Sequence, residues 1–497
     1  MNPDVSKMRR WTKRDVWGSA LLFLLNLFIL LVVVATLLMG GSLGNIKQTL
    51  EENKANYIYI AFCVMLLVFI TYFYFFFEER SVLYEGKSIM LVFVILDLSF
   101  ILCVLTGKWL NVYARPVALC ALLTFILLGR RSAMFMNIVN ALLLFIFDNF
   151  STVTPSAQSI YSALMIAFTG GMIAIFAANR LRTRLRVVLV GLLIAAPMDF
   201  IVFLLEISSM ASGGSSFEQT GAARNIWINL GYGFIGGISS AVLFLLFLPL
   251  FESMFSVLTV FRLRELTSLD SPLLKKLKEE APGTYNHSAV VSQLAEECAV
   301  ALGEDAELAR AAALYHDVGK LHHPEYFTEN QGEYNLHDEL TPELSADIIR
   351  SHTTDGHDLI LSNHLPEFFA DVALQHHGTL AIGYFYAKAQ KMYGGEVNKE
   401  DFSYTGPKPQ SKIAAIIMVA DASEAATRSL PNKTPEEVEK RVRRLIEERM
   451  NQEQFAECDI TMADLTLLRL TLVNALTGVY HKRVDYPSIH YGKKEGD

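Results

Sequence analysis

Ala313–Lys320 reads Ala-Leu-Tyr-His-Asp-Val-Gly-Lys, and the second half of the chain is organised around this stretch. The pair His316-Asp317 ends an alanine-rich run with helical character. A neighbouring imidazole and carboxylate can bind one metal ion, and the carboxylate has a second oxygen for another. The dipeptide alone is weak evidence, because it occurs by chance in many proteins. It gains weight from residues of the same types on either side, in the order His287, His316-Asp317, His352, His376-His377 and Asp421.

This order predicts a metal centre, although each member has a plainer interpretation by itself. A lone His287 or His352 is more often a surface or core histidine, and Asp421 could belong to a salt bridge. Lys320 follows His316 by four residues, on the same face if the helix continues. It could bind a substrate phosphate or interact with the helix C-terminus. The other histidines of this half have no place in the order, and we interpret them as solvated or structural: His322, His323, His337, His357, His364, His481 and His490.

Composition divides the chain of 497 residues into two parts. Residues 16–251 form a series of long apolar runs, whereas residues 262–497 have the composition of soluble protein. The net charge of −8 argues against a nucleic-acid polymer as partner, because such binding normally needs a basic surface. The five cysteines are scattered, so neither a disulfide framework nor a cysteine zinc site is indicated.

The apolar part predicts a polytopic membrane domain. Its first run exceeds the roughly 20 residues that cross a bilayer and the about 7–15 of a signal-peptide core. We therefore expect an uncleaved anchor, although Gly40-Gly41-Ser42 could imitate a cleavage site. We expect eight spans, at about 16–39, 57–77, 88–106, 112–128, 132–150, 158–178, 185–206 and 226–251.

Basic residues between the spans predict the orientation of the chain. Gly129–Arg131 and Asn179–Arg186 are basic and fall on the side of the N-terminus, which we therefore expect to be cytoplasmic. Lys108 and Arg115 fall on the outer side, against this rule. An even number of spans returns the soluble half to the cytoplasm. The three acids expected within spans are interpreted as hydrogen-bonded to neighbouring helices: Asp97, Asp199 and Glu206.

The predicted fold class is all-α, with the polytopic helical membrane domain followed by a cytoplasmic helical domain. No alternating strand pattern of useful length occurs. Within the soluble half, Thr341-Pro342 and Thr434–Glu437 have the sequence of helix N-caps. We expect helices at 287–302, 306–316, 411–428, 434–450 and 461–479, and one over 250–277 interrupted at Ser271-Pro272. The expected domains are 1–39 (N-terminus and first span), 40–56 (external loop), 57–251 (seven-helix membrane domain), 252–283 (linker) and 284–497 (catalytic domain).

Imidazole and carboxylate ligands suit divalent iron, manganese or zinc. Two such ions can hold a bridging water, lower its pKa from 15.7 towards about 7, and neutralise the oxygens of a phosphodiester. The residues that carry a family resemblance lie around these ligands, in segments spread over about 284–485. They are Ala281–Ser288 (APGTYNHS), Ala313–Lys320 (ALYHDVGK), Pro324–Gln331 (PEYFTENQ), Ser351–Gly356 (SHTTDG), Gln375–Thr379 (QHHGT), Gly406–Gln410 (GPKPQ) and Ala420–Ala425 (ADASEA).

With these segments the soluble half resembles the HD phosphohydrolase superfamily. The whole chain is similar to the seven-transmembrane HD phosphodiesterases of the PgpH type, which degrade cyclic di-AMP. The resemblance implies a di-iron or di-manganese centre in which Asp317 bridges the two ions. It also implies attack by a metal-bridging hydroxide and release of linear pApA. One ion would be held by His287, His316, Asp317 and Asp421, and the other by Asp317, His352, His376 and His377.

Two departures qualify the resemblance. The family usually has a large extracellular domain after its first span, whereas only Gly40–Asn56 stands here. The related HD-GYP enzymes, which cut cyclic di-GMP, carry an HHExxDGxGYP signature. This chain has His376–Thr379 and then Gly383-Tyr384-Phe385 without the proline, which favours cyclic di-AMP.

The expectation is thus a multi-pass protein of a bacterial plasma membrane with both termini cytoplasmic. Its partners would be cyclic di-AMP and the lipid bilayer, and a homodimer is compatible with the sequence. Asp317 and Lys320 are the expected catalytic residues, with Lys320 also binding substrate. Two alternatives remain open: a hydrolase of cyclic di-GMP, (p)ppGpp or nucleoside triphosphates, and a non-catalytic nucleotide receptor.

Overall fold

The computed structural model describes residues 13–39, 54–151, 157–178, 184–212, 222–332, 334–394 and 397–479. Across these ranges every regular element is a helix, and β pairing is limited to one isolated bridge between Ala381 and Ser403. The all-α fold class is therefore confirmed. The chain divides into two compact units, Met1–Phe261 and Arg262–Asp497. Residues 1–12, most of the predicted external loop (40–53), His481 and His490 lie outside the described residues.

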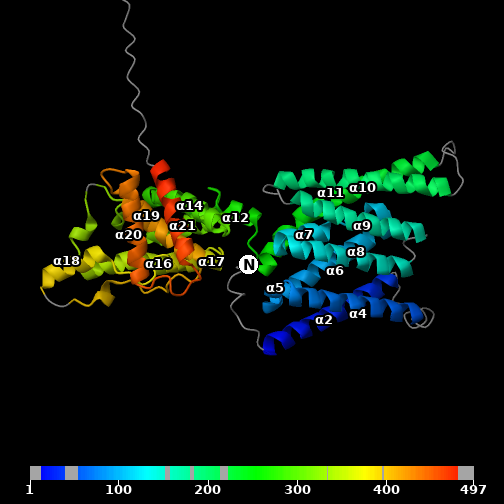
Figure 1. The fold of residues 1–497 in the computed structure, drawn as a ribbon, viewed down its shortest axis with the longest axis horizontal. Coiled ribbons are helices and arrows are strands. Elements are labelled where there is room, and N and C mark those ends of the chain that lie inside the picture. The colour runs from blue at the N-terminus through cyan, green and yellow to red at the C-terminus, as the bar shows by residue number, and fades with distance from the viewer. Residues whose placement is uncertain are drawn as a thin grey trace, which may run out of the picture. The chain divides into compact units, whose positions relative to one another are not determined.

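The first unit is a bundle of long apolar helices (Figure 1). Within the described residues, seven helices are long and apolar enough to cross a membrane. Large side chains such as Phe28 (65% exposed) and Phe62 (61% exposed) point away from the bundle, as expected where lipid replaces water. The seven helices are α2 (Lys13–Leu38), α4 (Lys54–Phe77), α6 (Gly86–Trp109), α8 (Arg130–Phe150), α9 (Ala157–Ala178), α10 (Arg184–Ser212) and α11 (Ala222–Phe255).

The fourth predicted span, 112–128, is not one continuous helix. A 3-10 turn, η2 (Val112–Ala114), is followed by extended residues and then by the short helix α7 (Leu119–Leu128). Pro116 explains the break, because proline disfavours helical geometry in the residue before it, and Arg115 has an extended ψ of 133°. The non-helical backbone here is buried within the bundle, where its polar groups avoid lipid.

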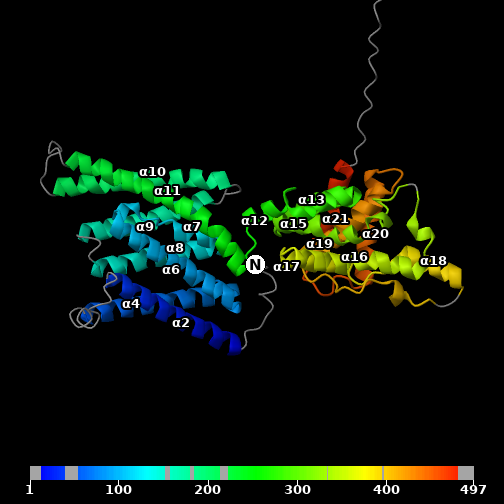
Figure 2. The same cartoon turned by 180° about the vertical axis from the view of Figure 1, so that it is seen from behind.

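The short fourth segment still returns the chain across the bundle. Figures 1 and 2 show that α2 begins and α11 ends at the same end of this unit. A pocket there is lined by Glu85, Lys87, Ser88 and Leu91, at the start of α6, and by Phe255, Ser256 and Val257, at the end of α11. The seven long helices of the described residues are one fewer than the eight expected spans, because the fourth expected span is the short segment with α7.

A buried ion pair lies inside this unit, between the short segment and the end of α8. The guanidinium of Arg115 donates two hydrogen bonds to Asp148, at 2.6 and 2.8 Å, and both side chains are at most 2% exposed. Gly107 leaves room for it, because a Cβ there would lie 2.5 Å from Nε of Arg115. Nearby, Glu206 accepts hydrogen bonds from Tyr113 (3.1 Å) and Asn229 (3.0 Å), as expected. For Asp97 and Asp199 the expectation is not confirmed, because each has a buried Oδ1 without a hydrogen-bond partner among the described residues.

The predicted helix over 250–277 is broken twice. Helix α11 ends at Phe255, and Ser256 has a left-handed φ of 55° that stops it. Two short helices follow, α12 (Val260–Leu266) and α13 (Pro272–Glu280), so the expectation of one break at Ser271-Pro272 was incomplete.

The second unit is a compact set of helices in which α14 packs against α15, α19 and α21, and α16 packs against α17 (Figure 1). Thr341 and Thr434 cap α16 and α20 as predicted, each accepting a hydrogen bond from the backbone three residues later. For the five helices with predicted ranges (α14, α15, α19, α20 and α21), the observed bounds lie within two residues of the predicted ones except at the start of α14; no ranges were predicted for α16, α17 and α18. The bounds of these helices follow. They are α14 (Pro282–Leu302), α15 (Ala306–Tyr315), α16 (Pro342–Ser362), α17 (Glu367–Gln375), α18 (Gly383–Tyr393), α19 (Lys412–Arg428), α20 (Pro435–Asn451) and α21 (Met462–Val479).

Candidate metal centre

Five helices bring the seven predicted ligands to one place in the second unit. His287 lies near the start of α14, and His352 lies in the middle of α16. The pairs His316-Asp317 and His376-His377 follow the last turns of α15 and α17, and Asp421 lies on α19. All of these side chains are buried except that of His377, which is 22% exposed. Residues 134 positions apart thus share one buried polar cluster.

The carboxylate of Asp317 divides this cluster into two sets. Its Oδ2 faces Nε2 of His316 at 3.3 Å and Nε2 of His287 at 3.8 Å. Its Oδ1 faces Nε2 of His352 at 3.5 Å and Nε2 of His376 at 3.6 Å. Each oxygen therefore has its own pair of imidazoles, which is the arrangement of a carboxylate that bridges two cations.

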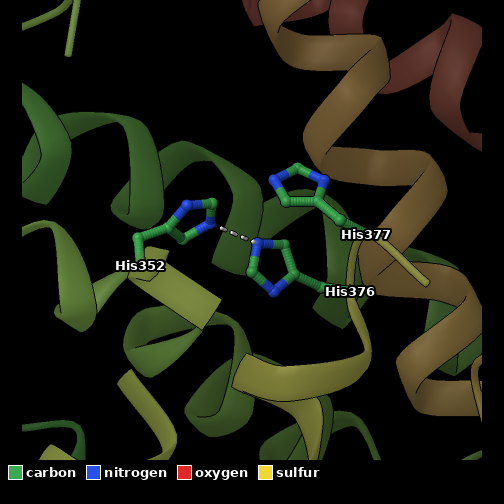
Figure 3. A group of neighbouring side chains, drawn as sticks. All are labelled: His352, His376 and His377. Atoms are coloured by element: carbon green, nitrogen blue, oxygen red, sulfur yellow. Dashed lines mark hydrogen bonds between the residues drawn. The ribbon is translucent and has the colours of Figure 1, made fainter. Parts of the chain in front are cut away.

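Asp421 and His377 complete the two sets. Oδ1 of Asp421 lies 3.0 Å from Nε2 of His287, and its Oδ2 lies 3.9 Å from Nδ1 of His377. Figure 3 shows the rings of His352, His376 and His377 turned toward one another. Ligand atoms of this trio lie within 4.8 Å of each other, as do those of His287, His316 and Asp317.

Hydrogen bonds on the far side of each ring fix its orientation. Nδ1 of His316 donates to the Ala313 carbonyl (2.7 Å), and Nδ1 of His376 donates to the Ala373 carbonyl (2.8 Å). His352 bonds in the same way to the carbonyl three residues earlier, that of Ile349. With Nδ1 engaged as a donor, each Nε2 presents a lone pair to the centre, which is how metal-binding histidines are usually oriented.

The residues present fit a divalent metal. Nε2 of His352 and Nε2 of His376 lie 3.3 Å apart, although both carry lone pairs when their Nδ1 atoms are protonated. Nε2 of His316 and Oδ1 of Asp317 are buried and have no hydrogen-bond partner among the residues that the structure describes. Unsatisfied buried polar atoms cost about 1–3 kcal/mol each, and a cation shared by these atoms would remove that cost.

The electrostatics of the cluster mostly favour the metal-binding forms. Burial lowers the pKa of His316 to about 4 and that of His352 to about 3, so both imidazoles are neutral near pH 7. Burial opposes ionisation of Asp317, but His316 and Lys320 outweigh it and hold the pKa of its carboxyl well below the usual value. Neutral imidazoles and ionised carboxylates are the forms that ligate metals.

His287 is the exception in this set. Burial lowers its pKa, but the hydrogen bonds with Asp421 and Glu424 outweigh burial and raise the pKa to about 10. Its Nδ1 lies 2.6 Å from Oε2 of Glu424, a buried carboxylate that the sequence did not single out. Glu424 follows Asp421 by three residues, so both lie on one face of α19, and this spacing was the available signal.

Lys320 lies beside the centre but is already paired. Its Nζ is 2.7 Å from Oδ2 of Asp317 and 2.8 Å from Oε1 of Glu329. The condition for a helical face shared with His316 is not met, because α15 ends at Tyr315 and a 3-10 turn (Val318–His322) follows. Glu329 also accepts a hydrogen bond from Thr284 at 3.1 Å, and its part in this network was not foreseen.

Two glycines allow the segments around the centre to approach. A Cβ at Gly319 would lie 1.9 Å from the carbonyl oxygen of His352. A Cβ at Gly283 would lie 2.0 Å from the carbonyl oxygen of Glu329. Side chains at these positions would therefore displace the loops that carry the ligands.

The other described histidines lie away from the cluster. His322 and His357 pair with Asp355 (3.3 Å) and Asp358 (3.0 Å). His337 is 4% exposed, and its Nε2 bonds to the Tyr326 carbonyl at 3.0 Å. These contacts fit the interpretation of such histidines as solvated or structural.

Comparison with known families matches both units. Residues 54–259 match the family described as 7TM receptor with intracellular HD hydrolase, and residues 284–426 match the HD domain.

Among curated proteins, the chain is 36% identical over 434 residues to the cyclic-di-AMP phosphodiesterase PgpH of Bacillus subtilis (strain 168). This alignment covers 85% of the chain and 59% of that relative. The chain is 46% identical over 259 residues to PgpH of Listeria monocytogenes serotype 1/2a (strain 10403S), covering 52% of the chain and 36% of the relative. It therefore spans well under two thirds of the length of the curated relatives that it matches.

A solved structure is also similar. The crystal structure of the L. monocytogenes PgpH HD domain in complex with cyclic-di-AMP has 47% sequence identity. It covers 43% of this chain and 100% of that one, with a TM-score of 0.42.

Proposed function

The chain belongs to the 7TM receptors with an intracellular HD hydrolase, and on this premise we propose that it is a membrane-anchored, metal-dependent phosphodiesterase. We propose cyclic di-AMP as its substrate and linear pApA as the product. The homology with the PgpH cyclic-di-AMP phosphodiesterases supports this substrate. The single observation that carries the proposal is the carboxylate of Asp317, each oxygen of which faces its own pair of imidazoles.

Two divalent ions, iron or manganese, would occupy the centre in this proposal. His287, His316 and Asp421 would hold one ion, His352, His376 and His377 would hold the other, and Asp317 would bridge them. Histidine and carboxylate ligands suit both metals. Bound divalent ions would lower the pKa of a coordinated water and offset negative charge on the phosphate oxygens.

The protein's own residues prepare this chemistry in three ways. The backbone carbonyls behind His316, His352 and His376 hold the rings with Nε2 inward. Lys320 stabilises the ionised form of Asp317, which must stay ionised to bridge. The burial of the cluster excludes bulk water, so each electrostatic contact is stronger than at the surface.

The remaining role proposed for Lys320 is at the substrate. Its ammonium lies 11% exposed beside Oδ2 of Asp317. A phosphate bound at the centre would come close to this charge, so Lys320 could offset part of the negative charge during cleavage.

We further propose that the catalytic unit is cytoplasmic in a bacterial membrane. An even number of passages, counting the short fourth segment, would bring both ends of the first unit to one side, and Arg130, Arg131, Arg184 and Arg186 follow the pattern of cytoplasmic loops. The membrane domain would extend over 57–251 after the first span, with a linker at 252–283 and the catalytic domain at 284–497.

The test is cleavage of cyclic di-AMP by the full chain in detergent, loaded with Mn²⁺ or Fe²⁺, with pApA measured by chromatography. A parallel panel of cyclic di-GMP, (p)ppGpp and nucleoside triphosphates separates the other nucleotide hydrolases. His352→Ala should lose cleavage. His357→Ala, five residues later on the same helix but outside the cluster, should retain it. Absence of pApA with either metal would reject the proposed substrate.

A further inference from the structure

Tyr404 lies against the accessible side of the metal centre. Its ring stacks on that of His377, with centroids 4.4 Å apart and planes inclined by 28°. It also meets the ring of His352 edge-on, at 6.0 Å. His377 is 22% exposed, whereas His316 and His376 are fully buried, so Tyr404 lies against the more exposed side of the cluster.

The backbone around Tyr404 is anchored to the segment that follows the ligand pair His376-His377. The N–H of Tyr404 donates to the Leu380 carbonyl at 3.0 Å. The N–H of Ile382 donates to the Phe402 carbonyl at 2.7 Å, beside the isolated bridge between Ala381 and Ser403. These backbone hydrogen bonds therefore hold Tyr404 beside His377.

The hydroxyl of Tyr404 makes no hydrogen bond with the part of the chain that the structure describes. Other tyrosines of this unit use their hydroxyls in such bonds. The Tyr315 hydroxyl donates to the Leu266 carbonyl at 2.7 Å, and the Tyr393 hydroxyl donates to Glu343 at 3.1 Å. The ring contacts with His377 and His352 place the phenol of Tyr404 next to two of the proposed metal ligands.

The choice of donors at this side of the centre is narrow. Lys320 has two of its three N–H donors engaged with Asp317 and Glu329, and the Nδ1 atoms of His316, His352 and His376 are held by backbone carbonyls. A phenol has an ordinary pKa of about 10, so it carries its proton at neutral pH and can donate it to an anion in a hydrogen bond.

We propose that Tyr404 is a substrate-binding residue whose hydroxyl donates a hydrogen bond to a non-bridging oxygen of the phosphodiester bound at the centre. This inference rests on the proposed function in one respect, that the substrate is a phosphate ester. Hydrogen bonds to charged groups change binding by roughly ten- to a hundredfold. The ring would at the same time support His377 by stacking.

Tyr404→Phe tests the hydroxyl while keeping the ring. In the full chain in detergent, loaded with Mn²⁺, we expect kcat/KM for cyclic di-AMP to fall about tenfold or more, with unchanged manganese content. Tyr384→Phe is the matched control, because Tyr384 is 67% exposed on α18, and it should behave as the unmodified protein. Unchanged kinetics in Tyr404→Phe would overturn the proposal, as would a loss of manganese, which would assign the hydroxyl to the metal site.

Binding of inorganic phosphate to the Mn²⁺-loaded full chain, measured by calorimetry, separates this inference from the choice of nucleotide. Tyr404→Phe should weaken phosphate binding even if the unmodified protein cleaves none of the nucleotides in the panel. Equal phosphate affinity in Tyr404→Phe and the unmodified protein would reject the contact, whereas failure to cleave cyclic di-AMP would reject only the proposed substrate.

Discussion

Oε2 of Glu424 lies 2.6 Å from Nδ1 of His287, and Nε2 of the same ring lies 3.0 Å from Oδ1 of Asp421. One imidazole is therefore clamped between two carboxylates that stand three residues apart on α19. Asp421 has the position of a metal ligand, whereas Glu424 is on the far side of the ring. Glu424 thus holds the ring of His287 in its orientation toward Asp421.

Glu424→Gln should weaken metal binding about 10–100-fold, because carboxylates behind metal-bound histidines typically have that effect. Metal content after dialysis against graded chelator, measured by mass spectrometry, checks this. Glu447→Gln, at an exposed position on α20, is the control and should bind metal normally. If Glu424→Gln retains metal as well as the control, Glu424 does not position His287.

Asp317→Asn should lose most of the bound metal and the cleavage activity together. The amide keeps the size of the side chain but provides only one oxygen, so it cannot face both pairs of imidazoles as the carboxylate does. The metal-to-protein ratio of the purified variant is the direct measurement. A variant that still holds two metals per chain would contradict the bridging role.

Lys320→Met should destabilise the metal-free protein by about 3–5 kcal/mol, since it leaves Asp317 and Glu329 without their cation in a buried place. Adding Glu329→Gln should recover part of this loss. Chemical unfolding of the single and double variants forms a cycle that measures the coupling. Additive losses would show that the 2.8 Å contact between Lys320 and Glu329 contributes nothing.

The stability of the metal-free protein should decrease on both sides of neutral pH. His316 and His352 have pKa values lowered to about 4 and 3, below the unfolded value of about 6.5, so their contribution is complete above 6.5 and declines as the pH falls. His287 has its pKa raised to about 10, so its contribution declines as the pH rises through that value. Thermal unfolding in chelator from pH 4.5 to 10 measures both limbs. A melting temperature that does not change between pH 7 and 5 would contradict the predicted contribution of His316 and His352.

Asp148→Asn should lower the stability of the membrane unit by about 3–5 kcal/mol, because the guanidinium of Arg115 would stay buried without its anion. Arg115→Met with Asp148→Leu removes both charges and should lie closer to the unmodified protein. Thermal unfolding in one detergent compares them. Arg444→Met, which removes an exposed contact with Glu448, should unfold normally.

The composition of the ligand set made the centre predictable. Few structural roles other than metal binding explain histidines and aspartates in this order. The membrane helices were predictable for a different reason, because their apolar runs are long. Pro116 was also visible in the sequence, and it could have warned that the fourth span would not be one helix. A 3-10 turn, extended residues and the short helix α7 stand in place of that span.

Contacts made by single polar residues were not predictable in the same way. The partner of a carboxylate depends on which helix the fold places beside it, and Arg115 and Asp148 are separated by 33 positions. Tyr404 belongs to none of the sequence segments that carry the family resemblance. Its proposed role depends on its position beside His377, which only the fold reveals. The salt bridges of Lys320 with Asp317 and Glu329 could not be predicted either, because they depend on the 3-10 turn that follows α15 and on the loop that carries Glu329.

The contact between Gly319 and the carbonyl of His352 links the two halves of the cluster mechanically. Gly319 follows Asp317 by two residues, so the turn that carries the central carboxylate rests directly on the backbone of the helix that presents His352. Even one methyl group at position 319 would push this turn away from the helix that carries His352. The distance between the two ligand sets therefore depends on the lack of a side chain at Gly319, a residue that would not itself contact a cation.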